Sequence, residues 1–246
     1  MDLYGLIGHP LGHSFSKKFF NEQFQNEMID AEYQNFDIDT IKSFPTIIEE
    51  YSNLRGLNVT IPYKELIIPY LDELSEDAQA IGAVNVIKIS RNHGGVHLKG
   101  YNSDVIGFTD SIRPLLKPFH KKALILGTGG ASKAIRYGLY KLGIETCFVS
   151  RRPKEGMLTY SDLTADIMAE HTVIVNCSPV GMFPHTDERP DLPYQFIGSH
   201  HILYDLVYNP DETLFMKSGK EQGATTKNGL EMLILQARAG WNFWNE

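Results

Sequence analysis

The sequence has little cysteine, no excess of positive charge and no long apolar run. Among its 246 residues are only two cysteines, Cys147 and Cys177, each in or beside an apolar stretch. That setting favours buried thiols over a disulfide or a metal site. The formal net charge of -7 argues against nucleic acid or an anionic membrane as the main partner. No apolar run approaches the roughly 20 residues that a membrane-spanning helix needs. An anionic small molecule is not excluded, because local basic residues can line a pocket.

The first residues also lack the basic start and apolar stretch of a signal peptide. This absence predicts a cytoplasmic location. Hydrophobic residues make up 42% of the chain and charged residues 22%, as in an ordinary globular protein. A length of 246 residues suits one large domain or two modest ones.

The first hundred or so residues alternate strand and helix patterns and end in a hairpin. Apolar patterning predicts strands at residues 3–8, 33–37 and 54–60, with helices after the first and second. Pro69 and Gly82 interrupt the helical stretch that follows the third strand. Residues 84–101 are predicted to form two strands joined by the turn Asn92-His93-Gly94-Gly95.

A different pattern begins at Lys121. Residues 123–126 form a wholly apolar strand, of the kind found inside parallel sheets. A helix to about Leu142 and strands at 146–150, 173–175 and 202–204 follow. This alternation is typical of a doubly wound nucleotide-binding domain. Because proline interrupts regular structure, the break between the two patterns is favoured at residues 114–118.

A glycine-rich turn joins the apolar strand to its helix, with the sequence Gly127-Thr128-Gly129-Gly130-Ala131-Ser132. Glycine lets the backbone turn tightly and approach a pyrophosphate, which then meets free N–H groups at the start of the helix. The strand–turn–helix context predicts a dinucleotide site, and the alternative is a turn that is only structural. Ser132 replaces the usual third glycine, and its small side chain still allows close packing.

The end of the next strand indicates which dinucleotide binds. An NAD site usually has an acidic residue there, which accepts hydrogen bonds from the ribose hydroxyls. This chain instead has Ser150, Arg151 and Arg152. A guanidinium can bind a 2′-phosphate through paired hydrogen bonds, so NADP is predicted. The alternative is a solvated basic loop.

Polar side chains in the first half follow the predicted strands. They are Ser14 and Ser16, residues 58–64, residues 82–85 and residues 102–104. Together they supply hydroxyls, amides, an amine and a carboxylate, which suits a small polyhydroxylated acid. Each also has a structural alternative. In this alternative Ser14 and Asp104 are helix caps, Lys64 is a surface lysine, and none of the three binds a ligand.

In order and spacing, these pieces resemble the shikimate dehydrogenase family. The family's S-x-S, N-V-T-x-P-x-K, G-A-V-N and N-T-D motifs match residues 14–16, 58–64, 82–85 and 102–104. Its G-x-G-G-A and Asn-Arg-Thr motifs match residues 127–131 and 150–152. The N-A-T-x-x-G-M loop, the Y-D-x-x-Y strand and the D-G-x-x-M-L-x-x-Q helix resemble residues 176–182, 204–208 and 228–236. The resemblance covers nearly the whole chain.

The resemblance implies two α/β domains with the active site in the cleft between them. Residues 1–104 would form the substrate-binding catalytic domain, with a C-terminal helix at 229–246 packing back on it. Residues 105–228 would form a Rossmann-like, doubly wound NADP domain. The implied activity is the NADP-dependent reduction of 3-dehydroshikimate to shikimate, in aromatic amino acid biosynthesis, by a monomer or homodimer. An NAD-accepting quinate or shikimate dehydrogenase, and a non-catalytic regulator that binds NADP or shikimate, are the alternatives.

The resemblance also implies a role for each matching residue. The substrate would lie on Ser14, Ser16, Asn58, Thr60, Asn85, Tyr208 and Gln236. The cofactor would lie on Gly127, Thr128, Gly129, Gly130, Ala131, Ser150, Arg151, Arg152, Leu206, Gly229 and Met232. Reduction of a ketone also needs a proton on oxygen, and Lys64 paired with Asp104 is the predicted source. An ordinary lysine is protonated at neutral pH and able to donate.

Overall fold

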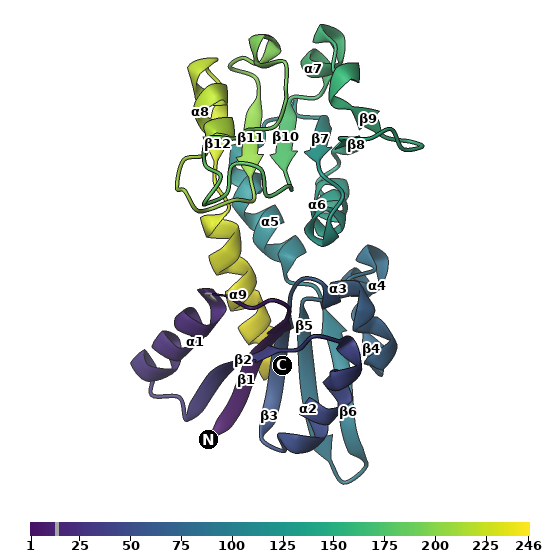
Figure 1. Cartoon of the computed structure of the whole chain (residues 1–246), viewed down its shortest axis with the longest axis vertical. Coiled ribbons are helices and arrows are strands. Elements are labelled where there is room, and N and C mark those ends of the chain that lie inside the picture. The colour runs from purple at the N-terminus through teal and green to yellow at the C-terminus, as the bar shows by residue number, and fades with distance from the viewer. Residues whose placement is uncertain (13–14) are drawn as a thin grey trace. The chain divides into compact units, whose positions relative to one another are not determined.

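The computed structural model describes residues 1–12 and 15–246 and divides into two compact units (Figure 1). The first unit comprises Met1–Ser103 and Ala237–Glu246, and the second comprises Asp104–Gln236.

The first unit contains a mixed sheet with helices on both faces. Its strands are β1 (Asp2–Gly8), β2 (Ala31–Asp37), β3 (Leu54–Val59), β4 (Glu73–Leu74), β5 (Val86–Asn92) and β6 (Gly95–Tyr101). Its helices are α1 (Phe15–Asn26), α2 (Phe44–Glu50), α3 (Tyr63–Leu66) and α4 (Glu76–Ile81). The C-terminal part of α9 (Leu230–Asn245) also belongs to this unit.

The order of strands in this sheet places several loops at one edge. The order is β2-β1-β3-β5-β6-β4. Strands β1, β2 and β3 are parallel, so the residues that follow each of them emerge at the same edge. Strand β5 runs antiparallel to β3, and β6 antiparallel to β5. The start of β5 and the end of β6 therefore lie at that edge as well, which we call the carboxyl edge of the first sheet.

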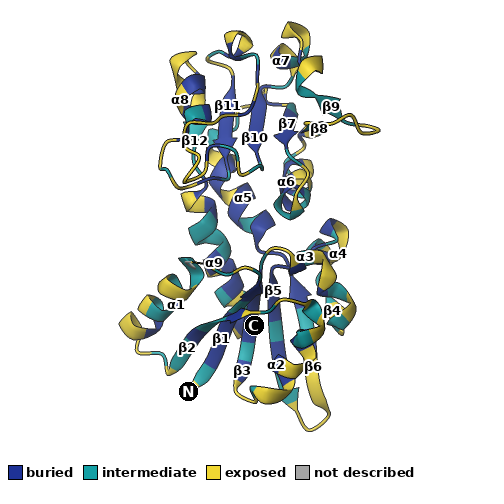
Figure 2. Cartoon of the chain, viewed as in Figure 1, coloured by how far each residue is buried: buried dark blue, intermediate teal, exposed yellow. Residues whose placement is uncertain are grey.

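Two apolar clusters hold the first unit together. One packs α2 and the loops around it against the sheet through residues such as Phe44, Ile47 and Leu57. The other packs α1 and the end of α9 against the sheet through aromatic side chains, including Tyr4, Phe20 and Trp244. The indole of Trp244 covers Gly56, where any side chain would collide with the ring, and its Nε1 donates to the carbonyl of Ile87 at 3.0 Å. In Figure 2 the central strands are mostly dark, as expected for strands covered on both faces.

The second unit is built on a parallel sheet. Its strands are β7 (Lys122–Leu126), β8 (Glu145–Ser150), β9 (Leu158–Thr159), β10 (Val173–Asn176), β11 (Ile202–Asp205) and β12 (Thr225–Lys227). Its helices are α5 (Asp104–Ile112), α6 (Gly130–Lys141), α7 (Ala165–Glu170), α8 (Leu214–Glu221) and the first part of α9. The order of strands is β12-β11-β10-β7-β8-β9, and each neighbouring pair is parallel.

This order is that of a doubly wound dinucleotide-binding fold, and it confirms the predicted fold class. The chain winds outward from β7 through β8 to β9, then returns to the other side of β7 and winds outward from β10 to β12. The direction reverses between β7 and β10, and ligands of open α/β sheets bind at such a switch point. The glycine-rich turn follows β7, and the loop at residues 176–182 follows β10.

The sequence placed the longer strands and the hairpin correctly, but it missed three short strands. Strands β4, β9 and β12 have two or three residues each, too few to show a pattern. Residues 114–118, favoured as the break between the two halves, lie inside the second unit. Helix α5 precedes them and packs on α6, where a Cβ at Gly138 would lie 3.0 Å from the side chains of Phe108 and Thr109. In residues 1–12 and 15–246, no helix combines the length and the apolar character that a membrane span requires.

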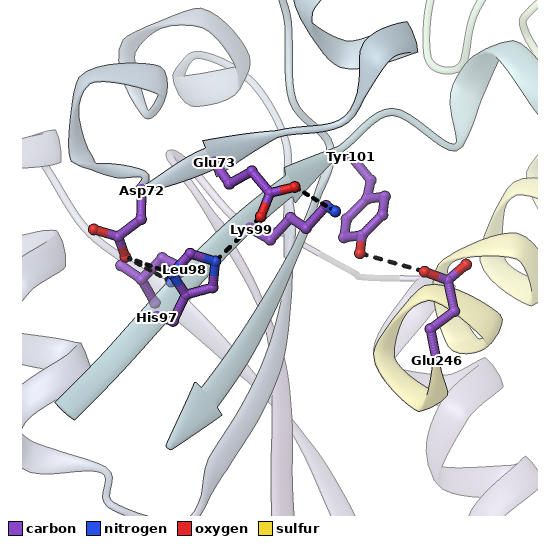
Figure 3. Close-up of polar contacts among 7 residues, drawn as sticks. All are labelled: Asp72, Glu73, His97, Leu98, Lys99, Tyr101 and Glu246. Carbon is purple, nitrogen blue, oxygen red and sulfur yellow. Dashed lines mark hydrogen bonds and ion pairs between the residues drawn. The ribbon is translucent and has the colours of Figure 1, made fainter. Parts of the chain in front are cut away.

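Charged side chains tie the outer strands and α9 together in the first unit (Figure 3). Lys99 lies 2.5 Å from a carboxylate oxygen of Glu73, and His97 lies 3.4 Å from the other. The hydroxyl of Tyr101 donates to the carboxylate of Glu246 at 3.3 Å. We interpret this cluster as support for the short strand β4 and for the end of α9, although each exposed ion pair contributes little free energy.

Candidate active site

The predicted substrate residues of the first unit gather at the carboxyl edge of its sheet. Asn58 lies at the end of β3, and Thr60 follows that strand directly. Asn85 precedes β5, and Ser16 lies in the first turn of α1. Ser14 lies outside the described residues, so its predicted roles as helix cap and substrate ligand stay predictions.

Buried hydrogen bonds fix Asn58 and Asn85. Asn58 is 6% exposed, and its Oδ1 accepts from the hydroxyl of Tyr33 at 2.7 Å. Its Nδ2 lies 3.4 Å from the carbonyl oxygen of Asn85. The side chain of Asn85 is itself held, because its Nδ2 donates to Ser103 Oγ at 2.9 Å and its Oδ1 accepts from the backbone N–H of Ser103 at 2.6 Å. These amides are held in place before any ligand binds.

The backbone around Lys64 is anchored on both sides. The N–H of Thr60 donates to the carbonyl of Ile7 at 2.9 Å. The buried hydroxyl of Tyr63 donates to the carbonyl of Ile38 at 2.5 Å. Lys64 is half-buried in α3, and its carbonyl accepts from the N–H of Val84 at 2.8 Å. The amine of Lys64 is therefore carried by a short helix whose position is fixed by backbone contacts.

Asp37 holds the loop that follows β1. Its carboxylate accepts from the N–H of Leu11 at 2.9 Å and lies 2.7 Å from Nδ1 of His9. The hydrogen bond from Leu11, and then the one from His9, lower the pKa of Asp37. This carboxylate holds His9 and Leu11, in the described segment that precedes the predicted serines.

In the second unit, the glycine-rich turn has the geometry that a dinucleotide site needs. Gly127 has a φ of 97°, a conformation that residues with side chains rarely adopt. A Cβ at Gly127 would lie 3.4 Å from atoms of Cys177 and Ser178, across the switch point between β7 and β10. Apart from their chain neighbours and the backbone of α6 itself, no described atom lies within 4 Å of the position that a Cβ would take at Gly129 or Gly130.

The start of α6 is suited to an anion. Gly129 is its N-cap residue and has no side chain to occupy the first amide groups. Ser132 is buried and its hydroxyl donates to the carbonyl of Gly129 at 2.6 Å, so this small side chain braces the turn from within. The turn therefore offers space and backbone donors at the start of a helix, as a pyrophosphate requires. The turn also contains Thr128, which is exposed, and Ala131, which is half-buried.

Two exposed arginines follow β8. The N–H of Arg152 lies 3.4 Å from Oγ of Ser150, which tightens the start of the loop. Arg151 lines a cavity of about 620 Å³ with Tyr160, Arg189 and other residues from the loops at 159–161 and 188–191. Burial raises the pKa of Tyr160, and the charge of Arg151 opposes that effect. Both guanidinium groups belong to the unit that carries the glycine-rich turn.

A buried carboxylate joins the loops beyond β10 and β11. Asp205 is 0% exposed and accepts from Asn176 Nδ2 at 2.9 Å, the N–H of Val207 at 3.1 Å and the hydroxyl of Thr213 at 2.6 Å. Oδ1 of Asn176 in turn accepts from the hydroxyl of Ser178 at 2.6 Å. Burial raises the pKa of Asp205 to about 6, although the three hydrogen bonds lower it. Asp205 thus fixes the two loops at the switch-point edge of the sheet.

The structure brings together the three cofactor residues predicted beyond this edge. A Cβ at Gly229 would collide with the carbonyl group of Leu206, so only glycine fits there. The N–H of Gly229 donates to the carbonyl of Val207 at 3.1 Å. Met232 and Leu206 pack in one apolar cluster. Leu206 therefore lies directly against Gly229 and shares an apolar cluster with Met232.

The remaining predicted residues belong to the second unit and are more scattered. Asp104 is buried and is the first residue of α5, so it is not the cap residue that precedes this helix. Gln236 packs beside α5, where a Cβ added at Gly107 would lie 2.9 Å from the Cβ of Gln236. Tyr208 is 41% exposed. Lys64 belongs to the first unit and Asp104 to the second, so their pairing stays a prediction.

Comparison with known proteins identifies the family. The sequence profile of the shikimate dehydrogenase substrate binding domain matches residues 6–87. A shikimate dehydrogenase (NADP(+)) of Syntrophomonas wolfei is 40% identical over 255 residues, which cover 96% of this chain and 86% of the relative. The chain belongs to the shikimate dehydrogenase family.

Solved structures of the shikimate dehydrogenase family share the fold. Shikimate 5-dehydrogenase from Thermus thermophilus, in complex with NADP(H) and shikimate, is 28% identical with a TM-score of 0.84, over 99% of this chain and 93% of that one. The enzyme from Listeria monocytogenes, in complex with shikimate and NAD, is 28% identical with a TM-score of 0.85, over 99% and 91%. These similarities confirm the resemblance inferred from the motifs.

Two residues that hold the candidate site were not predicted from the sequence. Tyr33 donates to Asn58 from inside the sheet, and Asp205 joins the loops beyond β10 and β11. Tyr33 stands in an ordinary strand pattern, so nothing in the sequence distinguishes it from a core tyrosine. The position of Asp205 could have indicated its role, because a carboxylate at the end of an apolar strand needs hydrogen-bond donors when it is buried.

Proposed function

We propose that this protein interconverts 3-dehydroshikimate and shikimate with NADP as its cofactor. The observation that carries the proposal is the 40% identity to a named NADP-dependent relative across 96% of the chain. The geometry supports it, because polar residues gather at the carboxyl edge of the first sheet and a dinucleotide turn lies at the switch point of the second. An enzyme of this kind needs both parts.

The substrate would be held by groups that match its chemistry. The hydroxyls of Ser14 and Ser16 would bind the carboxylate. The amides of Asn58 and Asn85, with Thr60, would bind the ring hydroxyls, and their fixed orientation favours a ligand of one shape. Tyr208 and Gln236 would complete the site from the second unit.

The residues of the second unit fit NADP. The turn at Gly127–Ala131 would hold the pyrophosphate, and Ser150, Arg151 and Arg152 would hold the 2′-phosphate. Leu206, Gly229 and Met232 would lie against the nicotinamide. When bound, the reduced cofactor supplies the hydride for the ketone.

Lys64 would supply the proton. Its Nζ would donate to the carbonyl oxygen of 3-dehydroshikimate as negative charge develops there. The carboxylate of Asp104 would accept a hydrogen bond from Nζ, fixing its direction. In the reverse direction, the pair would take the proton from the shikimate hydroxyl.

The test is an absorbance assay for NADPH formed from NADP and shikimate. Steady and shikimate-dependent formation is expected. A protein that binds both compounds without forming NADPH would instead support the non-catalytic regulator. Equal rates with quinate would favour the broader dehydrogenase.

Replacing Arg151 with alanine tests the choice of cofactor. We expect KM for NADP to rise roughly 10-fold, because a charge-assisted hydrogen bond to the 2′-phosphate is lost. KM for NAD should hardly change, since NAD lacks that phosphate. Lys154→Ala, in the same exposed loop, is the matched control and should leave both values unchanged. Equal losses for both cofactors would show that Arg151 only supports the loop.

An NAD-accepting enzyme is the second candidate. The structure of the enzyme from Listeria monocytogenes was solved in complex with shikimate and NAD, which supports this second candidate. The absence of an acidic residue at positions 150–152 opposes it. Rates with both cofactors at equal concentration separate the two. A cytoplasmic location and a monomer or homodimer stay predictions.

A further inference from the structure

Tyr33 places a hydroxyl in the interior of the first unit. Its side chain is 0% exposed and comes from β2, next to the N-terminal strand. The ring stacks on Phe20, with centroids 5.0 Å apart and planes 14° apart, and packs near Trp244. Packing on these rings fixes the ring of Tyr33, and therefore the position of its oxygen.

The hydroxyl of Tyr33 joins two residues that come from different elements. It donates to Asn58 Oδ1 at 2.7 Å, at the end of β3. Burial raises the pKa of Tyr33, and a hydrogen bond with the side chain of Ser16, at the start of α1, opposes that effect. A tyrosine hydroxyl has a single proton, and that proton goes to Asn58, so the hydrogen bond between Ser16 and Tyr33 is one that Ser16 donates.

The same hydrogen bonds continue to Asn85. Asn58 Nδ2 lies 3.4 Å from the carbonyl oxygen of Asn85, whose side chain is held by Ser103. The hydroxyl of Tyr33 therefore links Ser16 and Asn58, and Asn58 extends this chain of hydrogen bonds to the backbone of Asn85. Burial raises the pKa of Tyr33 well above its ordinary value, so the hydroxyl keeps its proton and its role as donor.

We infer that Tyr33 is a positioning residue of the substrate site, whose hydroxyl fixes the side chains of Ser16 and Asn58 before substrate binds. This inference rests on the proposed function. A side chain that is already held in its bound conformation loses less freedom when the ligand binds. A residue that holds such a side chain therefore improves affinity without contacting the ligand itself. A carboxylate is a stronger acceptor than a phenol oxygen, so the proton of Ser16 would turn from Tyr33 to the substrate as it binds.

The test is Tyr33→Phe, which removes the oxygen and keeps the ring. We expect KM for shikimate to rise about 3- to 10-fold, the equivalent of one net hydrogen bond. We expect kcat to stay within about twofold, because the residues that move protons are untouched. KM for NADP should not change, since the cofactor would lie on the second unit.

Tyr204→Phe is the matched control. Tyr204 is also 0% exposed, and its hydroxyl lies 2.6 Å from that of Ser111, inside the second unit. Both variants lose a buried hydroxyl, so both should lower the melting temperature. Only Tyr33→Phe should raise KM for shikimate. Equal KM values for the two variants would overturn the inference and leave the proposed function intact.

A double-mutant cycle separates positioning from a general loss of stability. If Tyr33 acts through Ser16, the KM of the Ser16→Ala and Tyr33→Phe double variant should rise by less than the product of the two single effects. Independent effects that multiply would overturn the inference. A wild-type protein that neither binds nor oxidises shikimate would overturn the proposed function, and this inference with it.

Discussion

Replacing Lys64 with alanine is expected to lower kcat by roughly 10²- to 10⁴-fold, the usual contribution of general acid–base catalysis. The interaction of Lys64 with the substrate oxygen strengthens as charge develops on that oxygen, so the loss should fall on kcat more than on KM. The backbone of Lys64 is held by Val84, and alanine retains that hydrogen bond. The fold around α3 should therefore survive the change.

Steady-state kinetics with shikimate and NADP measure this effect. Lys18→Ala is the matched control, because Lys18 is a lysine of the same unit whose side chain is 79% exposed beside Glu22. The control should keep the wild-type kcat. A Lys64→Ala variant whose kcat stays within about threefold of wild type would remove Lys64 from the mechanism.

Replacing Asp205 with asparagine is expected to change how stability depends on pH. The folded pKa of Asp205 is raised to about 6, whereas an ordinary aspartate titrates near about 3.9. The folded protein therefore retains a proton that the unfolded chain has already lost. The stabilisation is fully present below about pH 4 and is lost as the pH rises through about 6. The loss corresponds to about 3 kcal/mol of unfolding free energy.

Asparagine does not ionise, so Asp205→Asn should gain about 3 kcal/mol relative to wild type between about pH 4 and pH 7. Urea unfolding at several pH values measures the difference. Asp162→Asn is a control of opposite sign, because hydrogen bonds from Thr159 lower the pKa of Asp162. That variant should lose stability relative to wild type as the pH rises toward about 4, the ordinary pKa of an aspartate, and should show no further change above it. A pH-independent difference between Asp205→Asn and wild type would show that the carboxyl group does not titrate in this range.

Much of the fold could be predicted from local patterns. Residues 123–126 are apolar throughout, and they form the central strand of the second sheet. The turn at Asn92–Gly95 predicted a hairpin, and β5 and β6 pair across it. The parallel direction of the strands could be expected from the alternation of strand and helix, because parallel strands need a crossover between them. Short strands such as β4 could not, since they are held by pairing with a distant strand.

The polar groups that could touch a ligand were predictable, but the groups that hold them were not. Ser16 and Asn58 belong to motifs, so a resemblance finds them. Tyr33 is remote in sequence from both, and only the pairing of β2 with β1 brings its hydroxyl to them. Likewise, the donor Thr213 reaches Asp205 from the start of another helix. Such contacts depend on tertiary packing, which a local pattern does not record.

Helix α9 has a consequence for how the chain folds during synthesis. Residues 237–246 belong to the first unit, although the whole second unit precedes them in sequence. When residues 1–103 leave the ribosome, the face of their sheet around Tyr4 and Gly56 still lacks the ring of Trp244 that covers it. Domains generally fold in the order in which they are made. Here the second unit can complete its sheet first, and the unit translated first finishes its core last.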